Sequence, residues 1–84
     1  LLRGEVVSAN EAGFLIEAPI KLAEEANLKA SGEFIEKSGY GGSLLRTSPK
    51  AGVLSASGQY FNRVDAVGMN EEVARKIRRN ILNL

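Results

Sequence analysis

The first apolar residues of the chain form two short runs separated by a turn. Residues 5–9 are rich in strand formers, and residues 14–17 return after the turn Asn10-Glu11-Ala12-Gly13, where Gly13 can adopt a positive φ. This pattern predicts a β-hairpin over residues 5–18. Because the run Phe14-Leu15-Ile16 is continuous rather than alternating, we expect at least one strand to be covered on both faces.

The next segment has its apolar residues at helical spacing. Leu22, Ala26 and Ala30 follow one another at intervals of four residues, which places them on one face of a helix. The spacing predicts a central helix over residues 20–31, continuing to residue 37. The alternative is that residues 33–36 form a short strand.

Residues 38–58 contain five glycines and one proline, which exclude a long helix. Short strands are predicted at Leu44-Leu45 and at Val53-Leu54, joined by a turn over residues 48–52. Residues 59–68 fit either a strand or a short helix.

The C-terminal residues 71–84 carry the clearest pattern in the chain. Asn70 is a favourable N-cap, and Glu71 and Glu72 suit the positive end of the helix dipole. The apolar side chains fall within an arc of about 100° of a helix; they are Val73, Ala74, Ile77, Ile81 and Leu84. We therefore predict an amphipathic C-terminal helix.

Together these elements predict a small α+β domain over residues 1–84. It consists of an N-terminal β-hairpin, a central helix, short strands in a Gly/Ser-rich segment and a C-terminal amphipathic helix. The chain begins with Leu1-Leu2-Arg3 rather than Met. We therefore expect a processed product or a piece of a longer protein. A chain of 84 residues buries only about 60–65% of the surface of its unfolded state, so its core is thin.

The composition excludes several kinds of chemistry. The chain has no Cys and no His, which excludes disulfides, Cys-based zinc sites and His-dependent catalytic triads. Glu33 and Glu36 are a possible carboxylate pair at i,i+3, but a solvated helix face is the simpler interpretation. We therefore predict no enzymatic activity, no cofactor and no metal site.

Four cations stand close together near the C-terminus: Arg75, Lys76, Arg78 and Arg79. On a helix they point away from the apolar arc, where they are able to neutralise phosphates of a nucleic acid or to contact an acidic protein. The simpler interpretation is a solvated helix face partly neutralised by Glu71 and Glu72. The charge is uneven along the whole chain, with a net of −3 over residues 1–38 and +4 over residues 39–84.

A glycine-rich loop is a second candidate site. Its residues are able to cradle an anion through backbone amides; they are Gly39, Gly41, Gly42 and Ser43. No lysine and no good helix follow, as the phosphate-binding loop requires. The alternative is a helix C-cap at Gly39 followed by a turn.

Leu28, Ile35 and Leu82 fall off the main apolar stripe of their predicted elements. Several such residues on a domain this small indicate an interface. The leading functional hypothesis is therefore a non-enzymatic protein-interaction or assembly module, acting as a homo-oligomer or as a small subunit of a larger complex. The alternative is a nucleic-acid-binding protein that uses the basic C-terminal helix. No run of residues is long enough for a membrane span, and the absence of a signal-like segment predicts a cytoplasmic location.

Overall fold

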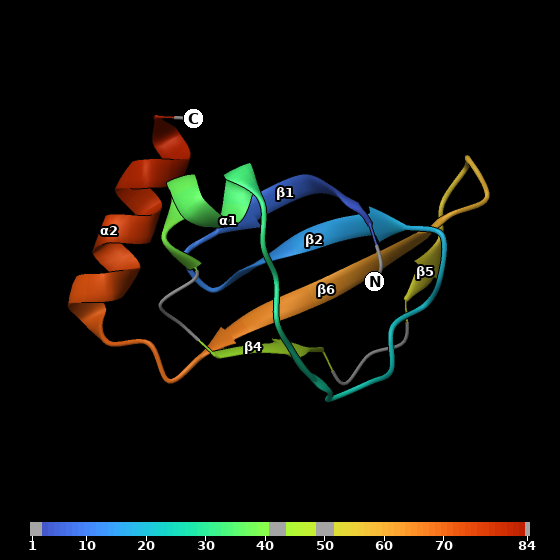
Figure 1. The fold of residues 1–84 in the computed structure, drawn as a ribbon, viewed down its shortest axis with the longest axis horizontal. Coiled ribbons are helices and arrows are strands. Elements are labelled where there is room, and N and C mark those ends of the chain that lie inside the picture. The colour runs from blue at the N-terminus through green and yellow to red at the C-terminus, as the bar shows by residue number, and fades with distance from the viewer. Residues whose placement is uncertain (1–2, 41–43, 49–51, 84) are drawn as a thin grey trace.

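The computed structural model describes residues 3–40, 44–48 and 52–83. These residues form an α+β domain built on one six-stranded antiparallel sheet, as the sequence predicts for the class (Figure 1). The elements are β1 (Glu5–Asn10), β2 (Gly13–Ala18), β3 (Asn27–Leu28), α1 (Glu33–Ser38), β4 (Leu44–Thr47), β5 (Val53–Leu54), β6 (Tyr60–Val67) and α2 (Glu71–Leu82).

The longest strand, β6, lies at the centre of the sheet. The order is β1-β2-β6-β4-β3, and β5 pairs with the end of β6 that β4 leaves free. The predicted hairpin is confirmed as β1 and β2, and its turn is closed by the Asn10 side chain, which accepts hydrogen bonds from the N–H groups of Ala12 and Gly13. Leu44-Leu45 and Val53-Leu54 are strands as predicted, and each pairs with β6. For residues 59–68 the strand alternative is correct.

The predicted central helix is present, but only its continuation toward residue 37 is helical; the helix predicted over residues 20–31 is wrong. The segment crosses the sheet without a helix and adds only the two-residue strand β3; the helix α1 begins later, at Glu33. The strand alternative for residues 33–36 is also wrong. Glu25 has a positive φ of 51°, which a helix does not allow.

Two buried polar side chains explain why this segment is extended. Asn62 on β6 accepts a hydrogen bond from the Leu22 N–H at 2.9 Å and donates one to the Ile20 carbonyl at 3.0 Å. Thr47 on β4 accepts from the Ala26 N–H at 2.7 Å. The backbone therefore finds its partners on the sheet, and these tertiary bonds outweigh the modest helix propensity of the alanines.

The core lies between one face of the sheet and the two helices. Its buried members are Phe14, Ile35, Tyr40, Leu45, Val64 and Ile77. Phe14 and Val64 are directly opposed across β2 and β6, and the ring of Phe14 lies 5.2 Å from that of Tyr40 and 5.6 Å from that of Phe34. These edge-to-face and tilted contacts add packing energy beyond the buried area.

Tyr40 joins the end of α1 to the first hairpin. Its side chain is fully buried, and its hydroxyl donates toward the carbonyls of Asn10 and Gly13, the latter at 2.9 Å. Burial raises the pKa of Tyr40 to about 12. The neutral phenol is therefore a structural part of the fold.

The C-terminal helix is confirmed, and it begins as predicted. Asn70 accepts a hydrogen bond from the Val73 N–H at 2.9 Å, and Ile77 is fully buried while Val73 and Ile81 pack against the core. The helix ends at Leu82.

We expect Asn70→Ala to lower the free energy of unfolding by about 1 kcal/mol, because the first turn of α2 loses its cap. Urea denaturation measures the loss. Asn83→Ala, at the exposed other end of the helix, is the matched control and should change stability by less than about 0.5 kcal/mol. Equal losses in the two variants would contradict a capping role.

We expect Tyr40→Phe to cost about 1–3 kcal/mol at neutral pH, because buried carbonyls lose a donor. Since burial raises the pKa of Tyr40 in the folded state, its contribution is complete below the unfolded pKa and declines as the pH rises toward about 12. The difference in stability between wild type and Tyr40→Phe should therefore shrink above about pH 10. A difference that stays constant up to pH 12 would contradict this role.

Candidate interaction surfaces

The three predicted apolar contact residues have different environments. Ile35 belongs to the core and is only 7% exposed, so it lies in the interior rather than at the surface. Leu28 is half-buried against the same core, because the segment around it is a strand on the sheet edge. Leu82, at the end of α2, is 81% exposed. Of the three, Leu82 alone has a largely exposed side chain.

The predicted anion loop falls mostly outside the described residues. Gly41, Gly42 and Ser43 are not described, and anion binding there stays a prediction. Gly39 is the C-cap of α1, with a left-handed φ of 91° and its N–H bonded to the Ile35 carbonyl. This is the helix-cap alternative that the sequence offers for Gly39.

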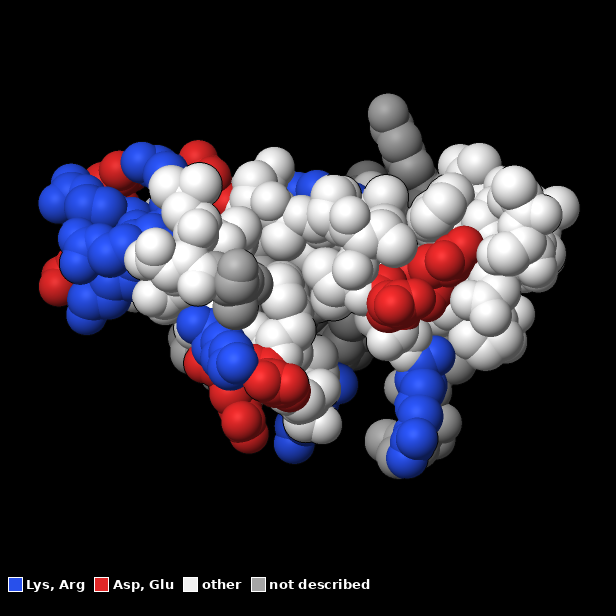
Figure 2. Space-filling view, turned by 90° about the horizontal axis from the view of Figure 1, so that it is seen from above, with Lys and Arg blue, Asp and Glu red and all other residues white. Residues whose placement is uncertain are grey.

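The four cations of α2 lie at one end of the molecule, where Figure 2 shows Lys and Arg side chains gathered together. Two of them have carboxylate partners: Arg78 lies 3.3 Å from Glu11, and Lys76 lies 3.9 Å from Glu72. The pKa of Glu11 is lowered, first by a hydrogen bond from its own backbone and then by the charge of Arg78. Within the described residues, Arg75 and Arg79 form no ion pair, and at i,i+4 they share one outward face of α2.

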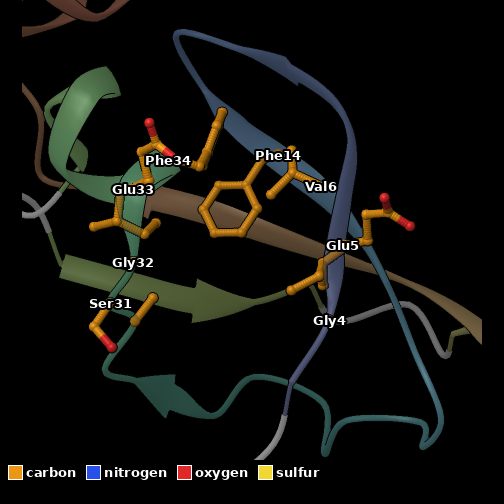
Figure 3. Close-up of a pocket in the computed structure, with 11 residues that line it drawn as sticks. Gly4, Glu5, Val6, Phe14, Ser31, Gly32, Glu33 and Phe34 are labelled. Atoms are coloured by element: carbon orange, nitrogen blue, oxygen red, sulfur yellow. The ribbon is translucent and has the colours of Figure 1, made fainter.

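A cavity of about 410 Å³ opens between the start of β1 and the segment that leads into α1. Figure 3 shows the Phe14 ring at its centre, with Val6 beside it and Phe34 above, while Glu5 and Glu33 stand on opposite margins. Lys37 lies 2.6 Å from Glu33 and, by hydrogen bond and charge, lowers the pKa of that carboxyl. The centre of the cavity is therefore apolar, and its two carboxyl groups, Glu5 and Glu33, lie at its margins.

Three exposed hydrophobic side chains, Leu44, Val53 and Val67, lie on the second face of the sheet. Successive side chains of a strand point to opposite faces of the sheet. Since Phe14, Val64 and Leu45 point into the core, their immediate neighbours along β2, β6 and β4 point away from it. We call this surface the open face; its side chains on β2, β4, β5 and β6 are Leu15, Glu17, Leu44, Arg46, Val53, Phe61, Arg63, Asp65 and Val67.

The elements that cover the sheet contact its other face. The helices pack on the core residues, and the crossing segment bonds to Asn62 and Thr47, which share the side of Val64. Figure 1 looks onto that side, with α1 and the crossing segment in front of the strands. Among the described residues, no helix packs on the open face.

Over β2, β4, β5 and β6 the open face is more apolar than a solvated sheet face normally is, whereas the outer strands β1 and β3 place the polar residues Glu5, Ser8 and Asn27 on the same side. Five of its nine side chains are large hydrophobics, and Leu44, Val53 and Val67 are 68%, 66% and 40% exposed. An antiparallel sheet with one solvated face usually alternates apolar and polar residues. Arg63 and Asp65, 3.0 Å apart, form an ion pair in the middle of this surface.

Sequence analysis missed most of this surface, although one signal for it was present. The continuous run over residues 14–16 predicts a strand covered on both faces, and Leu15 is its residue on the open face. The alternation at positions 61, 63, 65 and 67 becomes readable only once residues 60–67 are known to be a strand.

Two further features of the described residues concern membrane spans and metal ligands. None of their helices is long and apolar enough to cross a membrane, and they hold no cluster of three or more potential metal ligands. No family model, curated protein or solved structure matches the chain.

Proposed function

We propose that this protein is a non-enzymatic interaction or assembly module, acting as a homo-oligomer or as a small subunit of a larger complex. The observation that carries the proposal is the open face. Three of its apolar side chains, Leu44, Val53 and Val67, are exposed in the single chain, and burial of apolar area against a protein surface contributes about 25 cal/mol per Å².

The size of the domain supports the same proposal. A chain of 84 residues has a thin core, with six buried hydrophobic side chains in its central cluster. Covering a second face of the sheet adds apolar burial that the single chain lacks. Association then stabilises the folded state by mass action.

The non-enzymatic part of the proposal comes from the residue types. The chain has neither His nor Cys, and the Glu33 carboxylate beside the cavity is held by Lys37. An apolar hollow of this kind suits a side chain of a partner better than a reaction.

We expect light scattering, at two protein and two salt concentrations, to give the mass of a discrete oligomer that persists at high salt. Apolar burial is not screened by salt, whereas an assembly held by surface charges would dissociate. A stable monomer at high protein concentration would count against the proposal.

We expect Val67→Thr to weaken that association by about tenfold, because it places a hydroxyl on the open face at a side chain that is 40% exposed in the single chain. The change keeps a β-branched shape, so the strand should persist. Leu82→Ser is the control, since Leu82 lies on α2 and should leave the mass unchanged. The opposite ranking of the two variants would move the contact surface to α2.

A second candidate function is nucleic-acid binding by α2. The observation in its favour is the pair Arg75 and Arg79, outward-facing and without an ion pair in the described part of the chain. Two arginines of this kind are able to replace counterions at two phosphates.

If this second function holds, affinity for DNA or RNA should fall roughly tenfold between about 50 and 200 mM salt, the slope for two phosphate contacts. Arg75→Glu with Arg79→Glu should abolish binding while circular dichroism shows α2 intact. Normal binding by this double variant would exclude α2 as the site.

A further inference from the structure

We propose that the open face docks onto the open face of a second copy of this chain, in a two-fold dimer with β6 antiparallel to β6 across the interface. This inference rests on the proposed function and names the occupant of its surface. The evidence is the order of apolar and charged side chains along β6 and beside it.

The side chains of β6 on the open face have a self-complementary order. They read Phe61, Arg63, Asp65 and Val67: apolar, positive, negative, apolar. In the proposed dimer the two-fold axis lies between the two stacked sheets, passes over Val64 and runs perpendicular to β6. Rotation about this axis reverses the order of the side chains in the second copy. Arg63 then faces Asp65 of the second copy, and Phe61 faces its Val67.

The neighbouring strands repeat the match. Leu44 on β4 pairs with Val67, and Val53 on β5 pairs with Phe61, so both lie on the same side of β6 and at opposite ends of it. Rotation about the same axis leaves these residues on the same side of β6 but exchanges the two ends of the strand. Leu44 of one copy therefore meets Val53 of the other, and these are two of the most exposed hydrophobic side chains in the described chain.

The charges exclude the other two-fold arrangement of stacked sheets. With the axis along β6, each residue of that strand meets its own counterpart, and Arg63 would face Arg63 of the second copy. Like charges brought together in an interface cost several kcal/mol. The antiparallel arrangement instead pairs Arg63 of each copy with Asp65 twice, once within its own chain at 3.0 Å and once across the interface.

The outline of the molecule sets an upper bound on the face that a second copy can cover. The two longer extents of the molecule are 36 and 24 Å, and Figure 1, drawn in their plane, shows the strands broadside with α2 at one end. Their product of about 860 Å² is this upper bound, and it exceeds the ~800 Å² that each partner contributes to a standard interface. Two sheets packed in this way lie about 10 Å apart, with strands within about 30° of alignment.

The test uses two variants at exposed positions, Leu44→Lys and Val53→Glu, each in the full chain. In the proposed dimer either change places two charges against apolar side chains of the second copy, and its dissociation constant should rise about 100-fold or more. Circular dichroism checks the fold, and Leu82→Lys is the matched control on α2. Wild type and Leu82→Lys should have twice the chain mass, while each open-face variant should be monomeric.

An equal mixture of the two open-face variants provides the decisive measurement. In the mixed pair, the lysine at position 44 meets the glutamate at position 53, and the unchanged Leu44 meets the unchanged Val53. Native mass spectrometry should therefore find a heterodimer of one copy of each variant, although neither forms a dimer alone.

The outcomes separate this inference from the function on which it rests. A wild-type oligomer that both variants leave intact would overturn the open-face dimer and keep the assembly function at another surface. Two monomeric variants that do not combine on mixing would overturn the antiparallel arrangement. A wild type that is monomeric at about 1 mM would overturn the dimer together with self-assembly.

Discussion

The pairing of β6 with three other strands is the interaction on which the rest of this structure depends. β2 bonds along one edge of it, and β4 and β5 divide the other edge. Because every contact of β6 is fixed in register, the direction of each side chain along it is fixed as well. Val64 points into the core, and Arg63 and Asp65 point to the open face.

The covered face is closed by polar as well as apolar contacts. Asn62 and Thr47 are each 3% exposed, and they hold the crossing segment on the sheet through its backbone groups. Tyr40 ties the end of α1 to the first hairpin in the same way. These three side chains hold α1 and the crossing segment on one side of the sheet, and among the described residues no helix packs on the other side.

The two charged regions have different consequences. On α2, Arg78 lies 3.3 Å from Glu11 of the acidic half of the chain, whereas Lys76 pairs with Glu72 on its own helix. On the open face, Arg63 and Asp65 form an ion pair, and Arg46 on β4 lies directly opposite Asp65. The charges of this face are therefore concentrated at the middle of β6 and on the neighbouring strand.

The elements with local signals are predictable from the amino-acid sequence alone. The hairpin follows from its turn residues, α2 follows from Asn70 and the apolar arc, and the α+β class follows from the two together. The conformation of residues 20–31 depends instead on tertiary contacts, because Asn62 and Thr47 are distant in sequence and bond the backbone of this segment on the sheet. Tertiary packing also determines which apolar side chains are buried: Ile35 enters the core while Val53 and Leu44 stay outside. A local pattern shows that residues share a face, but only the packing of distant elements determines whether that face is covered.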